Sequence, residues 1–426
     1  MIDRIKGPEI QEITISAFPS YELVHLSNGI DLYILNAGTQ NIFKLDLVFH
    51  GGRRYETKRG VGRMCASILR EGIEGKSSDE LSEYWDFYGA IVSSYSDLDT
   101  AGLSLTSLNK HKSELLPTFV KMINQASFPI DELENKKKIF ADKLTRELSN
   151  NDVIGYRELT SIIYGSEHIY GYNTVPEDFA NITREDLVNH FENFWGAGRA
   201  YALLCGKIST EHKEEVIQHL SAIRQAKVHY EKSDLFPSEE FENPESVNIS
   251  TANKMQAAVK IGCATIHRNN PDFTVFYLLI QILGGYFGSR LMRNLREEKG
   301  LCYNIYASID RLKSSNYFYV SAEVDKNKLE LAIEEIKKEI ALLKTTLVSE
   351  DELKMVKNYI NGKILAGLDG PFRSSQLIKN YLSFELDFDT FRDFNERLAN
   401  ATPKQLKEIA NKYLDVDKMT QVVVGP

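Results

Sequence analysis

The stretch TREDLVNHFENFWGAGRAYALLCGK (residues 183–207) has a counterpart in TPKQLKEIANKYLDVDKMTQVVVGP (residues 402–426). Thr183 and Thr402 are 219 residues apart (402 minus 183), and the glycine that follows each apolar strand keeps this offset. Each stretch has a polar N-cap residue, a helical apolar pattern and then a short apolar strand. An internal repeat with a constant offset predicts a duplicated fold.

The pattern along each copy mixes strands with helices. Alternating apolar residues predict strands at 30–35, 44–50 and 317–324, and the first strand of the second copy is expected near Ala257. Ser77 and Ser349 each precede a glutamate by three residues, which predicts capping boxes at two helix starts. The sequence therefore predicts an α+β fold of two homologous α/β-sandwich domains, with antiparallel-rich sheets and helices packed on one face.

A polar segment separates the copies. The stretch HYEKSDLFPSEEFENPESVN is rich in charge, proline and serine, which is typical of a surface linker. We predict an N-terminal domain at 1–226, a linker at 227–246 and a C-terminal domain at 247–426.

Composition excludes several classes of protein. Of the 426 residues, 42% are hydrophobic and 26% are charged, which is typical of a globular protein and argues against disorder. A formal net charge of −9 disfavours nucleic-acid binding, and the basic run 136–138 is expected to be a solvated helix face. Four isolated cysteines and the lack of a long apolar run predict a reducing, cytoplasmic location without a membrane span.

The stretch GVGRMCASILREG (residues 60–72) occupies the frame of an inverted zincin helix, H-x-x-E-H, in which the two histidines bind zinc and the glutamate is the general base. Arg63 and Ser67 stand at the histidine positions, Ala66 at the glutamate, and Lys143, 76 residues after Ser67 (143 minus 67), at the third ligand. Arginine has no lone pair to give, serine is a poor zinc ligand, and lysine adds another cation. The N-terminal site is predicted to be catalytically inactive and to bind no metal.

Three further segments carry a resemblance to a known family: HGGRRYET, YGSEHIYGYNTVPEDFANITREDL and GGYFGSRLMRNLREEKGLCYNIYAS. They resemble the pitrilysin/insulinase family of zinc peptidases, which includes bacterial short-chain members and mitochondrial processing peptidase. This resemblance implies a duplicated metallopeptidase-like fold arranged as half of a clamshell. It also implies that Arg296 and Tyr303 form the pair that holds the substrate backbone and stabilises the oxyanion. The alternative is a purely structural role, in which Arg296 pairs with a carboxylate and Tyr303 packs in the core.

In two-chain members of the family, resemblance implies that one subunit holds the zinc motif and the other holds the Arg/Tyr pair. The expected function is therefore a non-catalytic, substrate-binding subunit of a heterodimeric zinc endopeptidase that cleaves peptides or unfolded proteins. This chain is expected to have no cofactor, with zinc in the partner subunit only, and to be inactive alone.

Three alternatives remain open for individual parts of this interpretation. The chain could be a scaffold or peptide-binding protein without a proteolytic role, in which Arg63 and Lys143 form ion pairs with Glu71 or Glu147 or bind an anion. It could instead homodimerise and bind peptides unaided. The glycines of GGYFG (residues 284–288) predict either a tight, closely packed turn or, by resemblance, a loop that contacts substrate.

Overall fold

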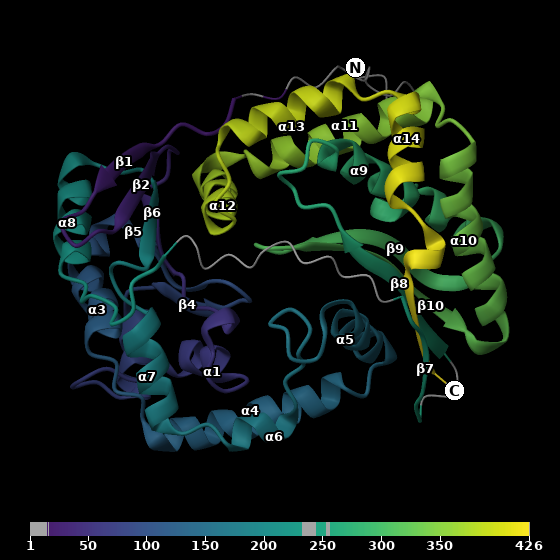
Figure 1. The fold of residues 1–426 in the computed structure, drawn as a ribbon. Helices are drawn as coiled ribbons and strands as arrows, with labels where there is room; N and C mark the ends of the chain where they lie inside the picture. The colour runs from purple at the N-terminus through teal and green to yellow at the C-terminus, as the bar shows by residue number, and fades with distance from the viewer. Residues whose placement is uncertain (1–14, 16, 232–243, 253–255, 426) are drawn as a thin grey trace, which may run out of the picture.

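The computed structural model describes residues 15, 17–231, 244–252 and 256–425. Two sheets with their helices lie on opposite sides of the molecule, the first in purple to teal and the second in green to yellow (Figure 1). Residues 232–243 of the predicted linker, 227–246, fall outside the described part of the chain. The described helices include none that is both long and apolar enough to cross a bilayer.

The first half contains a six-stranded mixed sheet. Its strand order is β1 (Glu22–His25), β2 (Asp31–Asn36), β6 (Ala200–Gly206), β3 (Ile42–Phe49), β5 (Ala101–Leu108) and β4 (Ile91–Ser96). Neighbouring strands are antiparallel except β2 and β6. The helices are α1 (Val61–Ile68), α2 (Ser78–Phe87), α3 (Lys112–Asn124), α4 (Ile130–Glu147), α5 (Asn151–Tyr164), α6 (Pro176–Ala180), α7 (Arg184–Phe194) and α8 (Thr210–Ser221). Apolar residues of β3, β5, α1 and α3 form its main core.

The second half repeats this plan with five strands. Their order is β7 (Ser246–Ser250), β11 (Thr420–Gly425), β8 (Gln256–Thr265), β10 (Asn316–Asp325) and β9 (Cys302–Arg311), and only β7 and β11 are parallel. The helices are α9 (Phe273–Ile280), α10 (Leu329–Thr345), α11 (Glu350–Gly367), α12 (Gly370–Ser383), α13 (Asp389–Asn400) and α14 (Pro403–Tyr413). Two π-helical segments, Gln281–Gly285 and Met292–Glu298, lie between α9 and β9. The predicted α+β duplication is confirmed.

Most predicted local features are also found. The three predicted strands correspond to β2, β3 and β10, although β7 precedes the strand expected near Ala257. Ser77 and Glu80 form the predicted capping box. At Ser349 only the N-cap bond forms, because the carboxylate of Glu352 instead accepts two hydrogen bonds from Arg290, at 2.9 and 2.7 Å. The ion pair with arginine therefore takes the place of the second capping-box bond.

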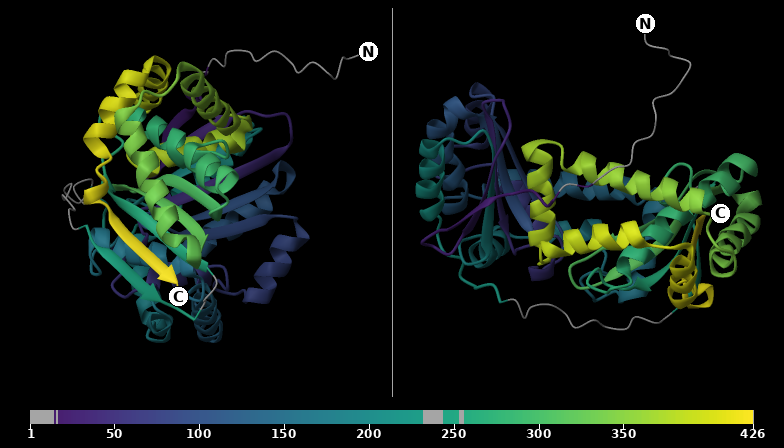
Figure 2. Two further views of the ribbon diagram at one scale, coloured as in Figure 1. Left: turned by 90° about the vertical axis from the view of Figure 1, so that its right-hand side faces the viewer. Right: turned by 90° about the horizontal axis from the view of Figure 1, so that it is seen from above.

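The two halves exchange one helix each, which the sequence patterns did not predict. Helix α5 packs on β8 and β11 of the second sheet, and α12 packs on β6 and β2 of the first, so each sheet has helices on both faces. Figure 1 and the view from above in Figure 2 show α12 against the first sheet. The two helices begin 219 residues apart (370 minus 151), so they are equivalent elements of the repeat.

A buried ion pair joins α5 to the second sheet. The side chain of Lys260 in β8 is fully buried, and its ammonium group donates hydrogen bonds to Asp152 of α5 and to the Ser321 hydroxyl, the latter at 2.6 Å. Gly155 allows the helix to approach, because a Cβ atom there would lie 3.2 Å from Cγ of Lys260. The ion pair between Lys260 and Asp152 therefore holds α5 against the second sheet near the close approach at Gly155.

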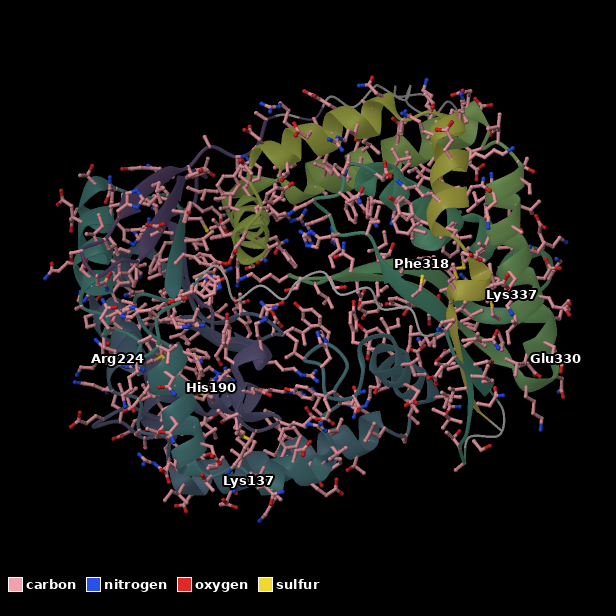
Figure 3. The ribbon with its side chains drawn as sticks, viewed as in Figure 1. Lys137, His190, Arg224, Phe318, Glu330 and Lys337 are labelled. Carbon is pink, nitrogen blue, oxygen red and sulfur yellow. The ribbon has the colours of Figure 1, made fainter. Side chains whose placement is uncertain are left out.

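The run 136–138 lies on α4, and Figure 3 shows Lys137 at the outer edge of the molecule. The ammonium group of Lys137 donates to Glu134 at 2.6 Å, and that of Lys136 lies 2.9 Å from a carboxylate oxygen of Glu71. These two ammonium groups are paired, and the side chains of Lys136 and Lys137 are only 24% and 14% exposed, so the run is less solvated than expected.

Three histidines of the first half are buried. Burial lowers the pKa of His190 and of His212 from 6.5 to about 4, and burial with the charges of Lys313 and Arg199 lowers the pKa of His50 to about 3. The ring of His212 packs edge-on against Phe43, 4.7 Å between centroids. These imidazoles are neutral in the folded protein at neutral pH.

We expect Asp152→Ala to lower the free energy of unfolding by about 3 kcal/mol, because the ammonium group of Lys260 would remain buried without its carboxylate. Lys260→Met should cost about 1 kcal/mol or less, because Asp152 is one-third exposed and can be solvated. Urea unfolding measures both values. A larger loss for Lys260→Met would contradict this account of the ion pair.

We also expect the free energy of unfolding to fall as the pH is lowered from about 6.5 towards 4, because the unfolded chain binds protons that the buried imidazoles do not. His212→Phe should keep the edge contact with Phe43. It should also reduce the slope of the unfolding free energy against pH, between pH 7 and 5, by the equivalent of about one bound proton. Urea titrations at several pH values measure this slope, and an unchanged slope in the variant would rule out His212 as a contributor.

Candidate functional site

The first part of the site is α1, whose N-terminus is held by a carboxylate. Glu56 accepts hydrogen bonds from the backbone N–H groups of Gly60 and Gly62, at 3.0 and 2.8 Å, and from the Tyr172 hydroxyl at 2.6 Å. Gly60 has a φ of 87°, a left-handed conformation that favours glycine. Burial raises the pKa of Glu56 although these hydrogen bonds oppose the shift. The network orients α1 against α4, α7 and β4.

The four degenerate zinc positions lie on α1 and α4, which pack against each other. Arg63 is exposed, and its guanidinium lies 5.0 Å from the ring centroid of Phe140. Ala66 is buried and Ser67 partly buried, while the Lys143 side chain is 53% exposed and lies 3.8 Å from Glu147. Within the described residues, no three His, Cys, Asp or Glu side chains are grouped as metal ligands. The residues at these positions do not fit a zinc ion.

The predicted ion-pair lattice around Arg63 and Lys143 is present only in part. Lys143 does pair with Glu147, but Glu71 pairs with Lys136 and accepts a hydrogen bond from Ser78 at 2.6 Å. No carboxylate of the described chain lies within ion-pair distance of Arg63. Of the two glutamates in this alternative, Glu147 pairs with Lys143, whereas Glu71 pairs with Lys136 of the adjacent helix α4.

Arg296 and Tyr303 form the second part of the site. Arg296 lies on the π-helical segment Met292–Glu298, and Tyr303 follows at the start of β9. The guanidinium lies 5.1 Å from the ring centroid of Phe287 and 5.7 Å from that of Tyr303, and these two rings are 66% and 78% exposed. Among the described residues, no carboxylate is within ion-pair distance of Arg296. The alternative of a paired arginine and a core tyrosine is therefore wrong.

A central cavity of about 650 Å³ lies between the two halves. The first half contributes Arg53, Arg63 and the turn at residues 95–100, and the second contributes Arg311 and Lys379. A neighbouring cavity of about 860 Å³, lined mostly by the second half, shares Arg311 with it. Lys379 stacks on Tyr95, 4.1 Å from the ring centroid, and burial lowers its pKa. Both cavities carry several cationic side chains.

The structure does not bring Arg296 and Tyr303 into these cavities. Tyr303 and Arg311 lie near opposite ends of β9, eight residues apart, which corresponds to about 26 Å along an extended strand. Tyr303 instead lines an open groove of about 520 Å³ together with Glu323, Asp325 and Lys328. Within one chain, the pair and the degenerate zinc positions are therefore separate.

The glycine turn shows close packing. A Cβ atom on Gly284 would lie 2.4 Å from the backbone nitrogen of Ala307, and one on Gly285 would lie 2.5 Å from the Gln281 side chain. These contacts explain both glycines, because Gly284 packs closely against β9 and Gly285 against the first residue of its own π-helical segment. A Cβ atom on Gly288 would contact only the ring of Tyr286, at 2.9 Å.

Sequence reasoning missed the cationic residues of the cavities. Arg53 lies within HGGRRYET, whereas Arg268, Arg311 and Lys379 lie outside the segments that resemble the family. Arg268 lies three residues after the end of β8, in HRNN, and a polar run after a buried strand is a usable signal for a site. Lys379 has no such signal, because it reaches the cavity only through the exchange of α12.

Comparison with known proteins supports this description. Residues 33–168 match the family described as "Insulinase (Peptidase family M16)", and residues 181–360 match the "Peptidase M16 inactive domain". An "Uncharacterized zinc protease" of Rickettsia felis is 21% identical, over 96% of this chain and 98% of its own. A "Non-peptidase homolog YmxG" of Helicobacter pylori is 22% identical, over 89% of this chain and 88% of its own.

Solved structures share the fold. The peptidase M16 inactive domain from Pseudomonas fluorescens superposes with a TM-score of 0.85 at 23% identity, covering 95% of this chain and 98% of its own. The periplasmic protease PqqL from Escherichia coli has a TM-score of 0.76 at 14% identity, and the match covers 100% of this chain and 49% of PqqL. The two family matches together cover most of the chain, residues 33–168 and 181–360, and the chain belongs to the M16, or insulinase, family of peptidases.

Proposed function

We propose that this chain is a non-catalytic, substrate-binding subunit of a heterodimeric zinc endopeptidase that cleaves peptides or unfolded proteins. In this proposal a homologous partner holds zinc, its ligands and the general base, and this chain supplies Arg296 and Tyr303. The observation that carries the proposal is that the two side chains lie together, Arg296 partly buried and Tyr303 exposed, and without a carboxylate partner in the described structure.

The chemistry of the pair suits a peptide carbonyl. Guanidinium and phenol are hydrogen-bond donors at neutral pH, so both can donate to a carbonyl or to the oxyanion that develops from it without changing protonation. The rings of Phe287 and Tyr303 hold the guanidinium in place by cation–π contacts at 5.1 and 5.7 Å. A donor already in position loses less side-chain entropy when substrate binds.

Two features support pairing with a second chain. The chain spans about half of PqqL, so a second copy of similar length would bring the pair of chains to the size of that protease. The distance of about 26 Å along β9 also argues against Arg296 and Tyr303 acting at the α1 frame of their own chain. A partner that places its zinc opposite the start of β9 would complete the site.

A scaffold or peptide-binding role without proteolysis is the second candidate. It is favoured by the likeness to the "Non-peptidase homolog YmxG" of Helicobacter pylori and by the cations at positions 63 and 143. Both roles keep a chamber that binds peptides. They differ in whether a partner with an intact zinc motif gains activity from this chain.

We expect the purified chain to show no peptidase activity alone, and activity to appear when it is mixed with a similar-length partner that carries an intact H-x-x-E-H motif. In that mixture Arg296→Ala and Tyr303→Phe should each lower kcat/KM by about 100-fold, because each removes one donor to the oxyanion. Cleavage of a quenched fluorescent peptide measures the rates, and chelation of zinc should abolish them.

Arg293→Ala is the matched control, because Arg293 lies on the same π-helical segment but pairs with Glu298 at 3.7 Å. Its mixture should cleave the peptide as the wild type does. If sedimentation shows a complex with the partner and the complex remains inactive, the proposed catalytic contribution is wrong and the scaffold role is supported.

A further inference from the structure

The 860 Å³ cavity of the second half contains two arginines held close together. Arg268 follows β8 and Arg311 ends β9, and both line this cavity. Burial and the nearby charge of Arg311 lower the pKa of Arg268 to about 9. Both guanidinium groups also act on the pKa of Tyr381, which lines the same cavity. The two cations and the Tyr381 ring therefore share one region of the wall.

Neither arginine has an acidic partner in the described structure. The guanidinium of Arg268 stacks on Phe384, 3.8 Å from the ring centroid, and its buried Nε has no hydrogen-bond acceptor among the described atoms. Asp310 is the acid next to Arg311 in sequence, but its Oδ2 accepts hydrogen bonds from Tyr156 and Tyr317, at 2.5 and 2.6 Å. Asp310 also lines the cavity, but it is hydrogen-bonded to these two tyrosines and forms no ion pair with either arginine in the described structure.

Each of the other charged side chains that line the cavity contacts a charged, polar or aromatic group nearby. Asp393 lies 3.5 Å from Arg392, and Arg397 donates to the carbonyl of Pro271 at 2.6 Å. Lys363 lies over the ring of Tyr359, 4.6 Å from its centroid. Arg268 and Arg311 are therefore two cations, close to each other, that an incoming anion would meet without first displacing an acid.

The rest of the wall is apolar and aromatic. Ile360, Ile364, Leu386, Phe391 and Phe394 line the cavity opposite a few amide side chains. An inorganic anion would leave this apolar surface in contact with water, whereas a carboxylate with an adjacent apolar side chain would satisfy the guanidinium groups and cover the apolar wall. The cavity volume is in the range of sites for small ligands and peptide ends.

We infer that Arg268 and Arg311 form a binding site for the C-terminal carboxylate of a peptide whose last side chain is apolar. The choice of a peptide as ligand rests on the proposed substrate-binding role, but the site itself lies within this chain and needs no partner. Arg311 also lines the central cavity, so a peptide anchored by its C-terminus would extend towards the space between the two halves.

Fluorescence anisotropy on the whole chain tests this, with a labelled hexapeptide that ends in phenylalanine as a free acid and the same peptide as a C-terminal amide. The free acid should bind at least about tenfold more tightly than the amide, because only it presents the charged acceptor. Arg268→Gln and Arg311→Gln should each weaken the free acid about tenfold and leave the amide unchanged.

Arg146→Gln is the matched control, because it removes the same charge from an exposed position on α4 that lines neither cavity. Circular dichroism of Arg268→Gln checks its fold, and exposed Arg311 provides a variant that should fold normally. Equal binding of acid and amide, no binding of the free acid at millimolar concentration, or unchanged binding in Arg311→Gln would overturn the inference.

An amidated peptide that ends in glutamate distinguishes the two sources of a carboxylate. If it binds as tightly as the free acid, the assignment to a C-terminus is overturned. Because no partner is present, these outcomes are independent of the activity test for Arg296 and Tyr303.

Discussion

The exchange of α5 and α12 between the two sheets is the constraint on which the rest of the structure depends. A fully buried Lys260 holds Asp152 of α5 on the second sheet, while Ile378 of α12 packs among Tyr33, Leu35 and Tyr201 on the first. Neither sheet is covered on both faces by its own half of the chain. The halves are therefore coupled, and the space between them is bounded by residues of both.

This coupling determines the chemistry of the central cavity. Helix α12 carries Lys379 to the first half, where it lies beside Tyr95 and opposite Arg63. Arg311 enters from the end of β9, so three cations from distant parts of the sequence line one space. The same cavity is also lined by the carboxyl groups of Glu56, Asp97 and Asp99. Its cations are not zinc ligands, because a zinc centre needs neutral or anionic donors with a free lone pair.

The two proposed binding regions lie towards opposite ends of β9. Partly buried Arg296 and exposed Tyr303 lie near its first residues, where a partner chain can approach, and Arg268 and Arg311 line a cavity near its last residue. A substrate held at the inner site and cut at the outer one would have to extend along the edge strand. The spacing of about 26 Å corresponds to roughly eight residues of extended peptide.

The sequence by itself determined the duplication, the α+β class, the family and the loss of zinc donors at positions 63, 67 and 143. These follow from residue types and spacing, which are local properties of the chain. Only the tertiary structure decided that Arg296 has no acidic partner among the described residues, that Glu71 pairs with Lys136, and that α5 and α12 each pack on the sheet of the other half. Such outcomes depend on which helix reaches which sheet, and equivalent helices of a repeat have the same apolar pattern whichever sheet they cover.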